Sequence, residues 1–177
     1  MKTIILGDIH GRTVWKDIIE KEQPDRTVFL GDYVSTHESI TAQQQIDNFM
    51  DILVAKELKP QKYVLLRSNH DLQHIGYWWA DCSGLNRKVQ DFMSESDIRE
   101  RFLTASQWVY EMKIGEENVV CSHSGISKVW MEQNNVHTPS DINLEPSFRL
   151  FRLPRHPFMT WMVIPLVNLA YGYALQL

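Results

Sequence analysis

The chain has 177 residues, of which 44% are hydrophobic and 23% charged, with a formal net charge of −4. This length and composition predict one globular domain with a hydrophobic core and exclude a disordered chain. The acidic balance and the lack of a long basic run argue against a nucleic-acid partner. The two cysteines, Cys82 and Cys121, form no CxxC pair, so we expect no disulfide framework. We find no secretory signal pattern and expect a cytoplasmic location.

Short apolar runs at residues 3–6, 27–30 and 62–66 have the length and composition of buried strands in a parallel sheet. Apolar residues recur at three- and four-residue steps over residues 12–22 and 40–58, which predicts an amphipathic helix in each interval between strands. Strands that alternate with helices favour an α/β fold.

The second half of the chain predicts more helices and a hairpin. Residues 85–93 and 98–105 have helical spacing, within an aromatic stretch that we expect to form a cap. Residues 108–114 and 118–122 predict two strands joined by a glycine-containing turn. A short helix over residues 127–134 follows.

Each predicted strand of the sheet is followed by side chains of the types that bind metals. These residues are Asp8 and His10, Asp32, Asn69 and His70, and His123. Any one block alone is better explained as a turn held by side-chain hydrogen bonds. In an open α/β sheet, however, ligands bind at the carboxyl ends of the strands, and all the blocks fall there in order.

Four ordered motifs resemble those of the calcineurin-like metallophosphoesterase superfamily: GDIHG at 7–11, GDYV at 31–34, LRSNHD at 66–71 and SHSG at 122–125. The second and third motifs lean toward the serine/threonine phosphoprotein phosphatase branch, including its bacterial or phage types. The resemblance implies a metallophosphoesterase-type β-sandwich of the α/β (α+β) class with flanking helices. Its site would lie at the carboxyl ends of the strands.

By position, the resemblance implies two divalent cations, one bound by Asp8 and His10 and both bridged by Asp32. Asn69 and His123 would complete the second site. These mixed oxygen and nitrogen ligands suit Mn²⁺, which we prefer, and also Fe or Zn²⁺. A hydroxide bridging the two metals would attack a phosphomonoester, so the implied enzyme is a phosphatase acting on a phosphoprotein or a small phosphorylated molecule.

Two more residues of the third motif have implied roles. His70 would donate a proton to the leaving oxygen, and Arg67 would bind the phosphate by charge-assisted hydrogen bonds. Asp71 either tunes His70 or caps a helix, and both interpretations stay open.

The chain departs from the family pattern in two motifs. The related phosphatases continue the second motif as Gly-Asp-x-Val-Asp-Arg-Gly, whose aspartate orients the catalytic histidine and whose arginine binds phosphate. Here Ser35 and Thr36 stand at those places, so we expect both groups to be missing. Ser68 replaces a glycine before Asn-His, where a strained or tightly packed backbone would disfavour serine.

The family also supplies a last metal-binding histidine from a C-terminal loop. After His123 the chain has only His137 and His156, and neither follows an apolar strand in a glycine-flanked loop. We therefore predict a metallophosphoesterase domain over residues 1–150, incomplete at its C-terminal end, and an atypical apolar tail over 151–177. Three interpretations of this tail stay open. It could be a membrane segment, which its prolines disfavour, or a strand pair that completes the sandwich. We prefer the third, in which the chain no longer follows the family pattern from about residue 150 and lacks the expected strands and last histidine.

Two other functions stay open. A truncated relative could bind metal without turning over substrate, as the missing ligand suggests. A phosphodiesterase or nuclease on the same scaffold is disfavoured because no basic stripe follows a phosphate backbone. The sequence leaves the oligomeric state open.

Overall fold

The computed structural model of the protein describes residues 1–77, 80, 82–144 and 174–176. Within these residues, five strands form a sheet in the order β4-β3-β2-β1-β7. The parallel strands β1 (Thr3–Leu6), β2 (Arg26–Phe29) and β3 (Tyr63–Leu66) form its centre. At one edge β4 (Ser106–Gln107) runs parallel to β3, and at the other β7 (Ala174–Gln176) pairs antiparallel with β1.

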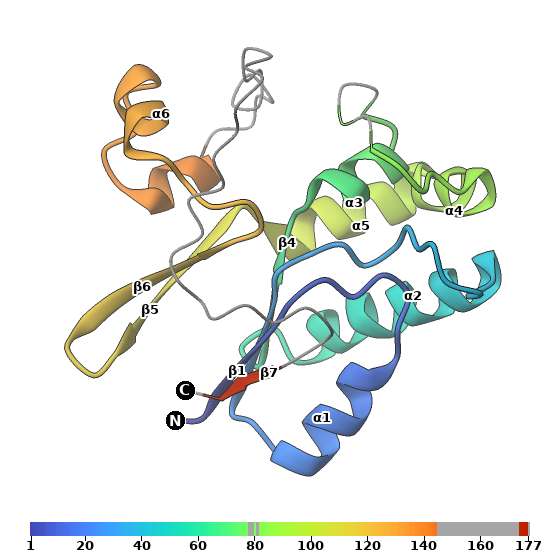
Figure 1. The fold of residues 1–177 in the computed structure, drawn as a ribbon, viewed down its shortest axis with the longest axis horizontal. Coiled ribbons are helices and arrows are strands. Elements are labelled where there is room, and N and C mark those ends of the chain that lie inside the picture. Colours follow the sequence, from blue (N-terminus) through green and yellow to red (C-terminus); the bar gives the residue numbers. More distant parts are fainter. Residues whose placement is uncertain (78–79, 81, 145–173, 177) are drawn as a thin grey trace.

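Helices cover one face of this sheet (Figure 1). After β1 comes α1 (Val14–Glu22), and after β2 comes α2 (Ala42–Leu58). Three shorter helices, α3 (Asn69–His74), α4 (Arg87–Met93) and α5 (Ser96–Ala105), follow β3. Each helix carries the chain back to the start of the next strand, so β1, β2 and β3 run parallel. Their carboxyl ends therefore share one edge of the sheet.

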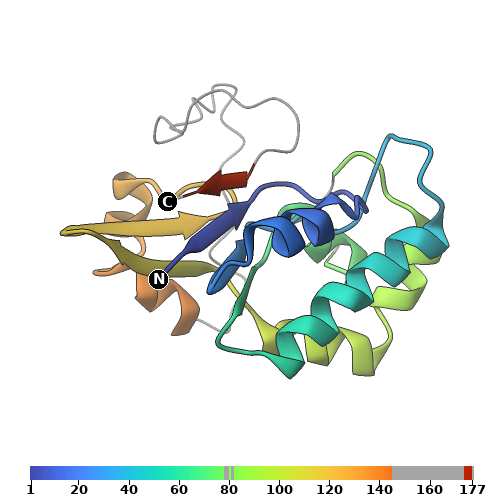
Figure 2. The same ribbon diagram turned by 90° about the horizontal axis from the view of Figure 1, so that it is seen from below.

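The hairpin of β5 (Val109–Ile114) and β6 (Glu117–Ser122) lies against the other face of the sheet (Figure 2). Side chains alternate between the two faces, as in any strand. Ile4 and Leu6 belong to the core beneath the helices, whereas Ile5 packs with Cys121 of the hairpin. The result is a sandwich with flanking helices, which confirms the predicted fold class.

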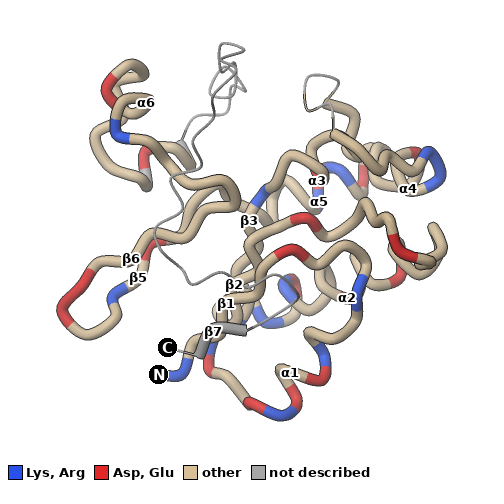
Figure 3. The backbone as a smooth tube through the Cα atoms, in the orientation of Figure 1, with Lys and Arg blue, Asp and Glu red and all other residues tan. Residues whose placement is uncertain are grey.

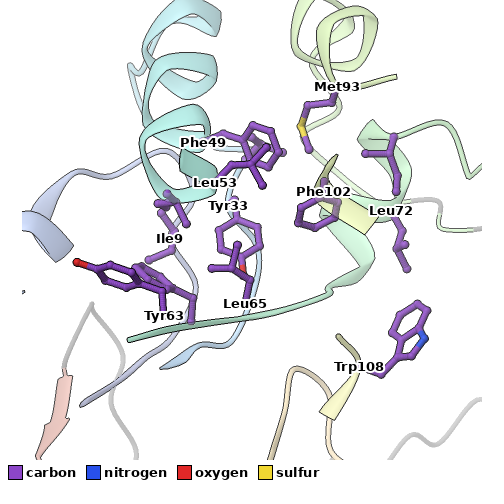
Figure 4. Close-up of a cluster of buried hydrophobic side chains, with 14 of the residues drawn as sticks. Ile9, Tyr33, Phe49, Leu53, Tyr63, Leu65, Leu72, Met93, Phe102 and Trp108 are labelled. Atoms are coloured by element: carbon purple, nitrogen blue, oxygen red, sulfur yellow. The ribbon is translucent and has the colours of Figure 1, made fainter. Parts of the chain in front are cut away.

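Tyr33 links the helix-side core to the edge where the strands end (Figure 4). Its ring is fully buried and lies 6.3 Å from the ring of Phe49 and 5.9 Å from the ring of Phe102, measured between centroids. The Tyr33 hydroxyl donates to the carbonyl of Leu66 at 3.0 Å. Packing and hydrogen bonding therefore fix the loop after β2 immediately beyond Asp32.

The sequence predicted no helix directly after the third strand, but α3 begins there, within the polar segment 67–71. The hydroxyl of Ser68 accepts a hydrogen bond from the backbone N–H of Asp71, which caps α3 and starts that helix at Asn69. The short strand β4 was also not predicted, because two residues carry no periodicity. The other predicted helices and strands agree with the structure to within about two residues at each end.

The final helices are α6 (Lys128–Gln133) and the 3₁₀ helix η1 (Pro139–Leu144). The predicted tail over 151–177 lies outside the described residues, apart from β7. Every helix in the described ranges is too short or too polar to span a bilayer.

Candidate metal centre

The loops that follow β1 and β2 are joined to each other by their backbones. The N–H of His10 donates to the carbonyl of Asp32 at 2.6 Å, and the N–H of Gly11 donates to the carbonyl of Tyr33 at 2.9 Å. His10 and Asp32 both adopt left-handed backbone conformations, with φ of 47° and 52°. Such conformations are unfavourable for non-glycine residues and gather at functional sites.

Gly31 allows the second loop to approach the start of α3. Its φ is +115°, and a Cβ atom there would lie 2.7 Å from the Cβ of Ser68. Ser68 itself has an ordinary extended backbone, with φ of −124° and ψ of 168°. The strain that the sequence suggested at Ser68 is therefore absent there, and the glycine that the packing requires is Gly31.

Asp8, His10 and Asp32 form a group that could hold a cation. One ligand atom from each lies within 4.8 Å of the others. The Nε2 atom of His10 is 3.6 Å from Asp32 Oδ2 and 3.9 Å from Asp8 Oδ2. Asp32 is 4% exposed, and its buried Oδ1 has no hydrogen-bond partner among the described residues. Because an unpaired buried carboxylate oxygen is costly, a cation beside Asp32 Oδ1 would fit the site.

The other side of Asp32 faces His123, at the end of β6. His123 Nε2 lies 3.6 Å from Asp32 Oδ1 and 3.0 Å from Asn69 Oδ1. The structure thus brings together all five residues that the sequence proposed as metal ligands, from four separate segments of the chain. Their roles as ligands stay a prediction.

Two histidines have their ring orientation set by backbone carbonyls. The Nδ1 atom of His10 lies 2.5 Å from the carbonyl oxygen of Ser35, and that of His123 lies 3.1 Å from the carbonyl oxygen of Leu30. Because a carbonyl can only accept, Nδ1 must carry the hydrogen in both rings. In the neutral form of His10 the lone pair is then on Nε2, the atom nearer Asp32, as in histidines that bind metals. In His123 both ring nitrogens face oxygen acceptors, since its Nε2 lies 3.0 Å from Asn69 Oδ1.

His70 lies beside this group, with its ring 5.5 Å from the ring of His10 in an edge-to-face arrangement. Burial lowers the pKa of His70, and the neighbouring imidazoles of His10 and His123 act in the same direction. The charge of Asp32 opposes them. The Nδ1 atom of His70 lies 2.9 Å from the hydroxyl of Ser35. The position where the phosphatases that the motifs resemble have an aspartate therefore does supply a partner for His70.

Arg67 is held by the segment that ends α5. Its Nη2 donates to the carbonyls of Leu103 at 2.6 Å and Ser106 at 2.8 Å, and its Nε donates to the Ser106 hydroxyl at 3.0 Å. The guanidinium also stacks on Trp108, 4.9 Å from the ring centroid. These contacts fix the side chain within the fold, and its predicted role in phosphate binding stays a prediction.

Asp71 supports the site in a way that neither interpretation from the sequence included. Its fully buried carboxylate accepts from the backbone N–H of Tyr33 at 2.9 Å and of Asp32 at 3.1 Å, and from the hydroxyl of Ser68 at 2.5 Å. Burial raises the pKa of Asp71 well above its usual range, and the charge of Asp32 adds to the rise. The Ser-x-x-Asp spacing of residues 68–71 was the one available sequence signal, since it is a helix-capping pattern.

A family model, a curated protein and a solved structure are similar to this chain. The family model described as calcineurin-like phosphoesterase matches residues 1–164. A probable serine/threonine-protein phosphatase of Encephalitozoon cuniculi is 27% identical over 140 residues, which are 76% of this chain and 29% of that protein. The chain therefore spans less than a third of the length of this relative. A solved serine/threonine phosphatase of Saccharomyces cerevisiae, with similarity to human phosphatase PP5, is 18% identical with a TM-score of 0.37, over 54% of this chain and 32% of its own.

Proposed function

Because this chain belongs to the calcineurin-like phosphoesterase family, we propose that it is a metal-dependent phosphatase that hydrolyses phosphomonoesters. The observation that carries the proposal is the position of Asp32. Each of its carboxylate oxygens lies 3.6 Å from the Nε2 atom of a different histidine, His10 on one side and His123 on the other. A carboxylate placed in this way could bridge two cations, for which Mn²⁺ is the preferred candidate.

The two cations, when bound, would supply positive charge to the phosphoryl group and lower the pKa of water. The protein's own groups would act around that charge. Asn69 and the two histidines would hold it in place, and His70 would deliver a proton to the leaving oxygen. A phosphoprotein or a small phosphorylated molecule would serve as substrate, and Arg67 would bind its phosphate.

A second candidate function is metal binding without turnover. The side chain of Asp8 is 59% exposed and that of His10 is 23% exposed, so the side of the group formed by these two residues is open to solvent. An open side that lacks a further ligand would hold a cation weakly, and a single bound ion could not clamp both oxygens of an in-line displacement.

Nucleic-acid hydrolysis has less support. Figure 3 shows that, along the helices of the described residues, Lys and Arg positions are mixed with Asp and Glu positions. A continuous basic track is what binding of a phosphate backbone requires.

One set of assays separates these functions. The Mn²⁺-loaded protein and its Asp32→Asn, His70→Ala and His137→Ala variants would be compared on p-nitrophenyl phosphate, a phosphoserine peptide and bis-p-nitrophenyl phosphate, with bound metal counted by elemental analysis. We expect about two ions per chain, and a loss of about 10²-fold or more in Asp32→Asn and, on the phosphopeptide, in His70→Ala. The exposed His137 serves as the matched control and should change nothing.

Parent activity no higher than that of the variants, with less than one ion bound, would rule out the phosphatase and support the metal-binding function. Faster hydrolysis of the diester than of either monoester would support the phosphodiesterase instead.

A further inference from the structure

Every polar atom of Ser35 lies within hydrogen-bonding distance of a partner. Its backbone N–H donates to the side chain of Gln45 at 3.0 Å, and its carbonyl accepts from the ring of His10. Its hydroxyl is 3.1 Å from the carbonyls of both Ser83 and Gly84 and 2.9 Å from Nδ1 of His70. The residue is 3% exposed, so water cannot readily replace these partners.

The direction of these hydrogen bonds follows from counting donors. A hydroxyl carries one hydrogen, and the two carbonyls around it can only accept. If the Ser35 hydroxyl donates to a carbonyl, it can accept from His70, and the ring then carries its hydrogen on Nδ1. The opposite direction would leave both carbonyls without this donor. The arrangement therefore favours the Nδ1–H tautomer of His70, in which protons are exchanged only at Nε2.

The space around the hydroxyl is matched to serine. Gly84 has φ of +77°, and a Cβ atom there would lie 2.6 Å from Ser35 Oγ. A longer acidic side chain at position 35 would meet the same backbone and would place a carboxylate, which only accepts, against two carbonyl oxygens. Ser35 is itself in the left-handed region, with φ of 70°.

We propose that Ser35 is a positioning residue, whose hydroxyl fixes the ring of His70 in the Nδ1–H tautomer and ties it to the backbone at Ser83 and Gly84. The segment that follows α3 is thereby connected directly to the proposed proton donor. This proposal rests on the proposed function only in the role given to His70, because the tautomer and the tie to the backbone are properties of the metal-free protein.

The first test observes the tautomer and needs no activity. Long-range ¹H–¹⁵N correlation spectra of the metal-free protein, labelled at histidine and kept at about pH 8.5 so that the rings are neutral, report which nitrogen carries the hydrogen. We expect Nδ1–H for His70 in the parent and loss of that preference in Ser35→Ala. Ser83→Ala is the matched control, since it removes a neighbouring hydroxyl and keeps the carbonyl that Ser35 uses. An Nε2–H tautomer in the parent, or an unchanged tautomer in Ser35→Ala, would overturn the proposal.

The second test separates proton delivery from general damage by the choice of leaving group. An alkyl phosphate needs a proton on its leaving oxygen, whereas p-nitrophenolate leaves without one. In Ser35→Ala we expect kcat to fall about 10²-fold for phosphoserine peptide, with KM and the p-nitrophenyl phosphate rate changed less than threefold. Equal losses on both substrates would show a structural role only and contradict the proposal.

Ser35→Asp tests the match to the two carbonyls. We expect it to leave the phosphopeptide rate as low as in Ser35→Ala, and full recovery by the aspartate would overturn the need for a hydroxyl that donates. If the parent itself hydrolyses nothing, the phosphatase proposal fails, and the spectra alone still decide whether Ser35 fixes His70.

Discussion

At the scale of single residues, Asp71 shapes a site that its carboxylate does not enter. Its carboxylate holds the backbone of the loop after β2 by accepting hydrogen bonds from the N–H groups of Asp32 and Tyr33. Removing it would leave the buried N–H of Tyr33 and the hydroxyl hydrogen of Ser68 without an acceptor, whereas the N–H of Asp32 would keep the Ser68 oxygen at 2.9 Å. Buried groups left unpaired in this way cost about 1–3 kcal/mol each.

We therefore expect Asp71→Ala to lower the free energy of unfolding by about 3 kcal/mol and to weaken Mn²⁺ binding by about 10- to 100-fold. Urea titration and calorimetric titration with Mn²⁺ measure the two effects. Asp97→Ala is the control, because the side chain of Asp97 is 79% exposed on α5. Equal stability of the two variants would show that Asp71 does not hold the loop.

Residues 6–8 and 30–32 are both Leu-Gly-Asp, so Gly7 and Gly31 form a matched pair of glycines. Gly31→Ala would combine a φ of +115° with a Cβ contact of 2.7 Å, whereas a Cβ at Gly7 would meet nothing within 4 Å. We expect a loss of stability of about 2 kcal/mol or more in Gly31→Ala and less than about 0.5 kcal/mol in Gly7→Ala. Thermal or urea unfolding of both variants gives the comparison, and similar values would contradict this account of the second loop.

The sequence alone identified the residues gathered around Asp32, because their types and order match a known set of motifs. It could not identify the contacts of Ser35 and Asp71. The hydroxyl of Ser35 meets residues 83–84, and the carboxylate of Asp71 meets the backbone of residues 32–33. In these contacts a side chain meets the backbone of a distant segment, and a backbone partner can have any residue type. A single sequence therefore carries no pattern that predicts them.

At the scale of the elements, α2 begins with a complete capping box. The Thr41 hydroxyl accepts from the N–H of Gln44, and the Gln44 side chain accepts from the N–H of Thr41. Thr13 stands at the same position of α1, but its side chain makes no capping hydrogen bond.

We expect Thr41→Ala to lower the free energy of unfolding by about 1 kcal/mol, and Thr13→Ala to change it by less than about 0.5 kcal/mol. Urea unfolding of the two variants measures this difference. A larger effect at Thr13 than at Thr41 would contradict the assignment of the caps.

The boundaries of long periodic elements could be predicted, since a buried face imposes its own spacing on the sequence. The start of α3 could not be predicted from periodicity, because its first residues are polar. Its capping residue, Ser68, also lies in the LRSNHD motif, whose residues were interpreted as part of the metal site. The pairing of β7 with β1 was not predictable either, since three residues at the edge of a sheet carry no distinctive pattern.

At the scale of the whole molecule, the two layers of the sandwich meet around Cys121. Burial raises the pKa of its thiol to about 11 from an ordinary value of 9.0. The unfolded chain therefore loses this proton at lower pH than the folded protein does. The contribution of the group to stability is complete below pH 9 and is lost as the pH rises toward 11.

We expect the parent to lose about 1 kcal/mol of unfolding free energy more than Cys121→Ala between pH 8 and pH 10. Urea unfolding of both proteins at the two pH values measures this difference. Because both proteins contain the other groups that titrate in this range, the effects of those groups cancel in the comparison. Identical pH trends in the parent and Cys121→Ala would show that the thiol ionises equally in the folded and unfolded chains.

The residues around Asp32 come from four segments, and the last of them, His123, follows a hairpin that packs on the far face of the sheet. Asp8, His10 and Asp32 are synthesised well before that hairpin, so the partner on the His123 side is the last to join the group. Any cation taken up at that stage would meet only one side of the centre and could exchange with the surrounding pool. Final metal selection would thus be a late event in biosynthesis, made when the hairpin docks, and set by the cations available to the nearly finished chain.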